Sequence, residues 1–107
     1  MQKRIHQLFP KGIEKVALKD FQGQPADGVS INQENDLLKS AGMHTGDIIV
    51  AVCGVRVHTF KQYTYGRKLK NTPELDLIVW HGGAYHECTA SPPDHLFGLR
   101  FGDYPPP

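Results

Sequence analysis

The sequence predicts one domain of mostly β structure with two helices, an α+β fold, and three observations lead to this prediction. An apolar run of mostly β-branched residues, Ile48–Val52, is typical of a strand buried on both faces. Gly54 follows this run, and Val55 and Val57 then restore the alternation of a half-buried strand, so a tight turn is expected between two strands. Apolar residues at helical spacing lie before this pair of strands and after it.

Composition limits the class of protein. A length of 107 residues corresponds to one domain, and a hydrophobic content of 39% indicates a globular chain rather than a disordered one. The net charge of +1, from 12 basic and 11 acidic residues, gives no electrostatic attraction to nucleic acid or to a membrane surface. Neither a membrane-spanning segment nor a signal peptide is expected, and the compartment stays open.

The segment before the central run predicts two strands. Residues 13–21 alternate weakly, with Val16 and Leu18 on one face, which favours a strand. Residues 22–27 contain Gly23 and Pro25 and are expected to form a loop. A short strand should follow over residues 29–31.

The first helix is expected over residues 34–41. Asn32 is a plausible N-cap, because its side-chain oxygen can accept from a free N–H of the first turn. Leu37 and Leu38 belong to its apolar stripe, and Gly42 follows at the position where glycine often ends a helix.

The second helix is expected over residues 59–70, with Thr59 as its cap. Three side chains are expected to face the core: Phe60, Tyr63 and Leu69. Gly66 stands in the middle of this helix, where glycine costs about 1 kcal/mol relative to alanine. Its presence suggests either a close approach to that face or a loose helix.

The last part of the chain predicts a hairpin and a tail. Residues 75–80 and 85–90 are expected to pair, with residues 81–84 as the turn. Residues 96–102 are apolar enough to dock on the body of the domain. Residues 104–107, Tyr-Pro-Pro-Pro, are typical of a polyproline-like end.

The centre of the chain resembles the signature of PDZ domains. Ala41-Gly42-Met43 is followed by Gly46-Asp47, an apolar strand and Gly54-Val55-Arg56-Val57, and only Cys53 departs from the asparagine that the family usually has before this glycine. The resemblance extends over residues 13–91. It implies a five- to six-stranded, partly open antiparallel barrel capped by two α-helices, with a domain at residues 12–91, an N-terminal extension at 1–11 and a partly docked tail at 92–107.

The resemblance also implies a function. PDZ domains bind an extended peptide or a protein C-terminus as an added strand, between an exposed strand edge and the second helix. The chain is most similar to bacterial PDZ-like domains attached to serine proteases, so we expect a regulatory or substrate-recognition module, monomeric within a larger protein. The alternative is a structural or self-association module without a free-peptide ligand.

The expected peptide-binding residues come from two segments. In the family, a loop of backbone N–H groups beside an apolar-Gly-apolar segment holds the peptide carboxylate. Two segments match this pattern, residues 11–13 and residues 98–101, and the N-terminal one is favoured because it precedes the strand near Val16. Gln62 and the open position left by Gly66 should face the peptide from the helix. The predicted site residues are Lys11, Gly12, Ile13, Glu14, Val16, Gln62, Gly66 and Leu69.

The sequence does not favour catalysis or a cofactor. His81, His86 and Cys88 could be interpreted as metal ligands, but no fourth ligand and no paired-cysteine spacing accompany them. His81-Gly82-Gly83 resembles an oxyanion-hole tripeptide without the serine elbow that such hydrolases need. We therefore expect no enzyme and no metal. Sequence alone does not establish a disulfide between Cys53 and Cys88, and we expect two free thiols.

Overall fold

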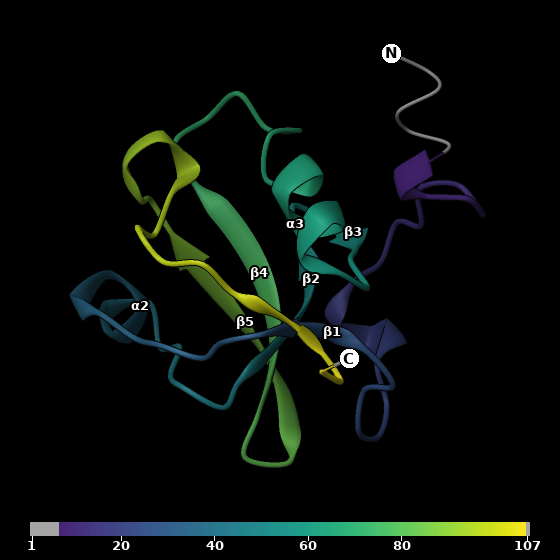
Figure 1. The fold of residues 1–107 in the computed structure, drawn as a ribbon, viewed down its shortest axis with the longest axis horizontal. Helices are drawn as coiled ribbons and strands as arrows, with labels where there is room; N and C mark the ends of the chain where they lie inside the picture. The colour runs from purple at the N-terminus through teal and green to yellow at the C-terminus, as the bar shows by residue number, and fades with distance from the viewer. Residues whose placement is uncertain (1–6, 107) are drawn as a thin grey trace.

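An open antiparallel sheet of six strands forms the framework of the molecule (Figure 1). The computed structural model describes residues 7–106. The strand order is β5-β4-β2-β1-β6, and β3 pairs with β2. The strands are β1 (Gly28–Ser30), β2 (Ile48–Val52), β3 (Val55–Arg56), β4 (Leu75–His81), β5 (Ala84–Ala90) and β6 (Gly102–Tyr104). The helices are α2 (Asp36–Ser40) and α3 (Phe60–Gly66), with 3-10 turns η1 (Leu18–Asp20) and η2 (Pro93–His95). The predicted α+β class is confirmed at this level.

β2 is buried on both faces, as its β-branched sequence predicted. On one face, Leu38 of α2 and Tyr63 of α3 pack against Val29 and Ile49. On the other face, segment 16–21 packs against a second cluster that includes Val50 and Ile78. Figure 1 shows α3 beside the strands β1 and β2, whereas α2 lies at the opposite end of the sheet.

Both helices are shorter than predicted. Asn35, not Asn32, caps α2, and its Oδ1 accepts a hydrogen bond from Leu38 N at 3.0 Å. The Thr59 cap of α3 is confirmed, because Thr59 Oγ1 accepts from Gln62 N at 3.2 Å. α3 ends at Gly66, so the expectation that Leu69 faces the core is wrong: its side chain is 44% exposed.

The strand predicted over residues 13–21 does not form. A single bridge joins Lys15 to Val55, and the chain then turns through η1, where Asp20 Oδ2 accepts from Ala17 N at 2.8 Å. Its neighbour β3 has only two residues, so it cannot support a longer ladder. The apolar side chains of this segment instead cover one face of the sheet.

The hairpin of β4 and β5 is confirmed, with Leu75 opposite Ala90 and His81 opposite Ala84. The segment predicted as a docked tail also contributes to the sheet. Its residues Gly102–Tyr104 form β6, which pairs antiparallel with β1. Residues 1–6 of the predicted N-terminal extension and residue 107 lie outside the described residues. No helix within residues 7–106 is long and apolar enough to cross a membrane.

Candidate functional site

The strand β6 ends the sheet, so one of its edges has no strand partner in residues 7–106. The direction of its backbone groups follows from β1. Ile31 donates to Asp47 O and accepts from Gly46 N, both beside β2. Because backbone groups alternate along an antiparallel ladder, Ser30 and Gly28 face β6. Asp103, which lies opposite Val29, therefore directs its own N–H and C=O to the open edge.

α3 lies next to this edge strand. The side chain of Asp103 accepts a hydrogen bond from Phe60 N at 2.7 Å, which supplies an acceptor for one of the free N–H groups at the helix start. The ring of Phe101, two residues earlier, lies 5.7 Å from that of Tyr63 and 6.4 Å from that of Phe60. An edge strand and the start of the second helix are thus held together by one hydrogen bond and by aromatic packing. We use the name β6–α3 groove for this strand edge together with the helix beside it.

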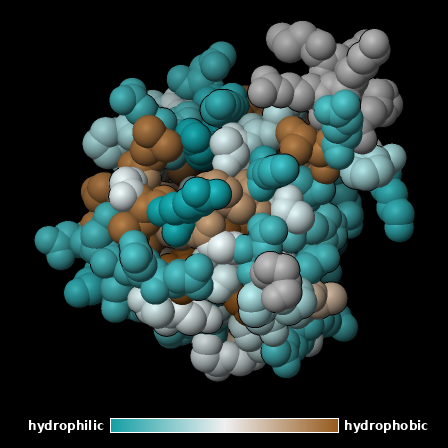
Figure 2. All heavy atoms as spheres, in the orientation of Figure 1, coloured by the Kyte–Doolittle hydropathy of each residue, from teal (hydrophilic) through white to brown (hydrophobic). Residues whose placement is uncertain are grey.

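A loop of residues 97–101 leads into the groove. Phe97 and Phe101 are buried and anchor its two ends, and Asn35 Nδ2 donates to Phe97 O at 2.7 Å. Gly98 has φ +77, a backbone conformation that favours glycine. Within the described part of the chain, the N–H groups of Gly98, Leu99 and Arg100 donate to no acceptor. Figure 2 shows apolar side chains on this face of the molecule, with polar ones between them.

The N-terminal segment predicted to bind the carboxylate lies elsewhere. Residues 9–14 line one side of a cavity of about 570 Å³, and Asp27, Arg56, His58 and Gln62 line the other. Five of the predicted site residues are therefore brought together here: Lys11, Gly12, Ile13, Glu14 and Gln62. This cavity does not include β6 or the loop before it. The structure thus separates the predicted carboxylate loop from the open strand edge.

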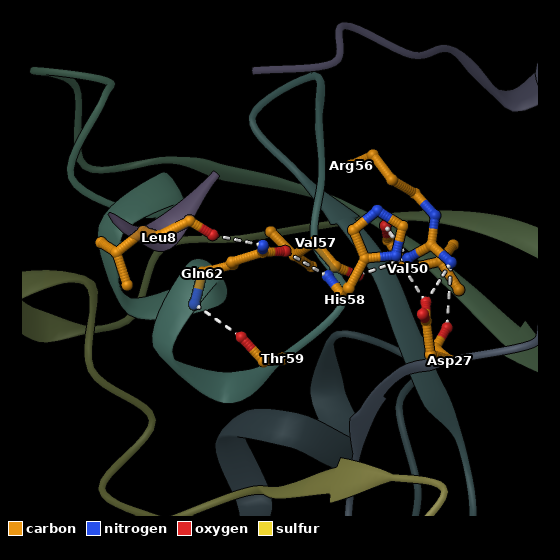
Figure 3. A network of polar contacts seen from close by, with 8 residues as sticks. All are labelled: Leu8, Asp27, Val50, Arg56, Val57, His58, Thr59 and Gln62. Atoms are coloured by element: carbon orange, nitrogen blue, oxygen red, sulfur yellow. Dashed lines mark hydrogen bonds and ion pairs between the residues drawn. The ribbon is translucent and has the colours of Figure 1, made fainter. Parts of the chain in front are cut away.

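Figure 3 shows a polar network whose members Asp27, Arg56, His58 and Gln62 line this cavity. Asp27 Oδ1 contacts Arg56 at 2.7 Å and His58 Nδ1 at 2.6 Å. Gln62 is buried and joins two segments, because its Oε1 accepts from His58 N at 2.6 Å while its Nε2 donates to Leu8 O at 2.6 Å. These contacts hold the N-terminal segment against α3.

A β-bulge places Arg56 in this network. The pairing of β2 with β4 shifts register between Ile49 and Ala51, and the carbonyl of Val50 is free for other donors. Val50 O accepts from Val57 N at 3.0 Å and from the Arg56 guanidinium at 3.1 Å. The guanidinium also donates to Val57 O, to Asp27 O and to Asp27 Oδ1, so both of its terminal nitrogens have acceptors.

Three predicted site residues lie outside the cavity and the groove. Val16 packs on the far face of the sheet, and Leu69 is exposed beyond the end of α3. The prediction that Gly66 leaves a peptide pocket open is wrong, because the space beside Gly66 is filled by Val52. A Cβ at Gly66 would lie 2.6 Å from Val52 Cγ1, so this glycine allows α3 to approach β2.

Burial shifts the pKa of three groups in or against the core cluster. Burial raises the pKa of the Tyr63 hydroxyl. Burial also raises the pKa of the Cys53 and Cys88 thiols, which are free. Among residues 7–106, no group of three or more His, Cys, Asp and Glu side chains is arranged to hold a metal ion.

Sequence reasoning missed Asp103, Phe60 and the Asp27–Arg56–His58 network as site residues. A signal existed for the first two, since the Gly98-Leu99-Arg100-Phe101 segment carries the expected loop pattern directly before β6. For the network, Arg56 and His58 are two apart on an extended segment and therefore share a face.

Comparison with protein-family models, curated proteins and solved structures finds no match to this chain.

Proposed function

We propose that this chain is a PDZ-like peptide-binding module that takes an extended segment by strand addition on the open edge of β6, beside α3. The observation that carries the proposal is the position of Asp103. Its backbone groups face the open edge, and its side chain bonds to Phe60 N at the start of the second helix. Strand addition needs an unpaired edge, and in PDZ domains the added strand also lies beside the second helix.

The loop of residues 97–101 is the better candidate for the carboxylate of a bound C-terminus. An antiparallel peptide on β6 ends near Gly102, where β6 begins, so its last residue meets this loop. The unused N–H groups of Gly98, Leu99 and Arg100 are suitable donors to a carboxylate. This location replaces the N-terminal loop, residues 11–13, which lines the separate cavity.

The proposed biological role is regulatory or substrate-recognising, within a larger protein of the protease-associated kind. The partner is a peptide or a protein C-terminus, and the module itself performs no catalysis. A monomeric domain is expected. The alternative, a self-association module, uses the same open edge of β6 to pair with a second copy.

A peptide selected from a library with free C-termini tests the proposal. Binding should perturb the backbone NMR signals of residues 97–104 and of α3. Amidation of the C-terminus should weaken binding by about 1–3 kcal/mol, the usual effect of losing a charge-assisted hydrogen bond. N-methylation at successive peptide positions should weaken binding at every second position, because only alternate N–H groups face β6.

These measurements distinguish carboxylate capture, strand addition and self-association. Equal affinity of the acid and amide forms contradicts carboxylate capture by residues 97–101. A uniform effect of N-methylation contradicts strand addition. A dimer in light scattering supports self-association instead, if the backbone NMR signals of β6 also change with protein concentration in the absence of peptide.

A further inference from the structure

The cavity lined by residues 9–14 and by Asp27, Arg56, His58 and Gln62 carries its own binding chemistry. We propose that it binds a carboxylate attached to an apolar body, at a site separate from the β6–α3 groove. Its volume of about 570 Å³ lies in the range of small-ligand sites, about 300–1,000 Å³.

The polar network that lines the cavity is preorganised. The Arg56 side chain is 11% exposed, and its four contacts go to Val50 O, Val57 O and two oxygens of Asp27. Gln62 uses both ends of its amide within the protein. Neither side chain needs to move or to give up a partner when a ligand enters, which lowers the entropy cost of binding.

The polar groups that remain for a ligand are Lys11 and His58. An ionised Asp27 only accepts hydrogen bonds, so His58 Nδ1 is the donor in their 2.6 Å contact. His58 Nε2 makes no hydrogen bond within residues 7–106, although the ring lines the cavity and its side chain is 41% exposed. Lys11 is exposed and forms no ion pair in the described part of the chain. With Nδ1 donating to Asp27, His58 Nε2 can donate to a ligand only when the ring is protonated, so Lys11 is the cation available to an anionic group.

The surrounding charges select a carboxylate over a phosphate. Asp27 and Glu14 also line the cavity, and two carboxylates nearby disfavour a dianion more than a monoanion. Phe9 and Ile13 supply apolar walls, and Ile13 is 37% exposed, so a ligand can reach it. A monoanion with an apolar body can pair with Lys11 and pack against Phe9 and Ile13.

The site does not depend on the proposed peptide groove. α3 contributes to both, but with different residues: Gln62 lines the cavity, and Phe60 contacts Asp103 of β6. A negative result for ligand binding in the cavity therefore does not contradict peptide binding at β6, and the reverse also holds.

The test uses the full chain labelled with ¹⁵N and titrated with 3-phenylpropionate, with 3-phenylpropionamide as the neutral control. The acid should shift the signals of residues 11–14, His58 and Gln62, and the amide should bind at least fivefold more weakly. N-acetylphenylalanine, which imitates the last residue of a chain, identifies the source of the carboxylate: clearly tighter binding than phenylpropionate indicates a chain terminus, and equal or weaker binding indicates a free acid. Absence of shifts at these residues up to 20 mM acid, with the protein folded, overturns the proposal.

Two variants sharpen this test. Lys11→Gln should weaken the acid about fivefold, the effect of one exposed ion pair, and leave the amide unchanged. Ile13→Asn should weaken both probes, because it removes part of the apolar wall. Lys19→Gln is the matched control, since Lys19 is exposed on η1 and does not line the cavity. Equal loss in Lys11→Gln and Lys19→Gln overturns the assignment of the carboxylate to Lys11.

Discussion

Asp103 and Phe60, far apart in the sequence, are joined by a hydrogen bond of 2.7 Å from Phe60 N to Asp103 Oδ1. Phe60 is the first residue of α3, and Thr59 Oγ1 already accepts from Gln62 N in the same turn. The start of α3 is therefore capped from two parts of the chain. The edge strand and the helix that border the proposed groove share this one contact.

Removing this contact should loosen the groove. Asp103→Ala takes away the acceptor for Phe60 N, and we expect a loss of about 1 kcal/mol in the free energy of unfolding, the typical effect of a lost helix cap. Asp103→Asn keeps an acceptor oxygen and should lose less. Urea unfolding of the three proteins measures the difference. The assignment of a capping role is contradicted if both variants match the wild type.

Gly66 should gain no stability from a larger residue. Helix propensity favours alanine by at most about 1 kcal/mol, because Gly66 is the last residue of α3, and the new Cβ would lie 2.6 Å from Val52 Cγ1. Val52 is fully buried and β-branched, so it yields little, and overpacking of this kind costs about 1–3 kcal/mol. Gly66→Ala should therefore be neutral to destabilising in urea, despite the better propensity.

A double variant checks the cause of that effect. Val52→Ala removes the clashing methyl groups, so the two substitutions together should cost less than the sum of their separate effects. Lys61→Ala, on the exposed side of α3, is the control and should stay within about 0.5 kcal/mol of the wild type. Strict additivity of Gly66→Ala and Val52→Ala would show that the glycine is needed for another reason.

The framework was predictable because local patterns determine it. The β-branched run at β2 and the spacing of the β4–β5 hairpin correspond directly to paired strands. The Thr59 cap was also predictable, since a threonine before an amphipathic stretch has a local hydrogen-bonding role.

The site was less predictable because its residues are separated in sequence. The pairing of β6 with β1 joins residues 102–104 to residues 28–30, and no local pattern encodes this contact. Gly66 shows the same limit, since its packing against Val52 depends on tertiary structure and not on its position within the helix.

The Asp27 network should matter more than an exposed ion pair. Asp27→Asn removes the anion that faces the nearly buried Arg56 guanidinium, and we expect a loss of about 1–2 kcal/mol, moderated because the Asp27 side chain is 39% exposed. Glu34→Gln is the matched control. It changes the exposed pair of Glu34 with His44 and should cost no more than about 0.5 kcal/mol. Similar losses for the two variants in urea would contradict a special role for the network.

Tyr63 should make the fold sensitive to alkali. Burial raises the pKa of its hydroxyl in the folded chain, so the folded state holds this proton more tightly than the unfolded state does. The contribution of Tyr63 to stability is therefore constant below the unfolded pKa of about 10 and is lost as the pH rises above it.

Tyr63→Phe removes this titration. Within residues 7–106 the Tyr63 hydroxyl makes no side-chain hydrogen bond, so the variant should lie within about 0.5 kcal/mol of the wild type at pH 8. Between pH 10 and 11.5 the wild type should lose stability faster than Tyr63→Phe, because only in the wild type does this phenol, protonated in the folded state, release its proton on unfolding, which stabilises the unfolded chain. Urea midpoints of both proteins at each pH measure the difference, and other alkaline titrations cancel in the comparison. Parallel curves for the two proteins would mean that Tyr63 ionises as readily in the folded chain as in the unfolded one.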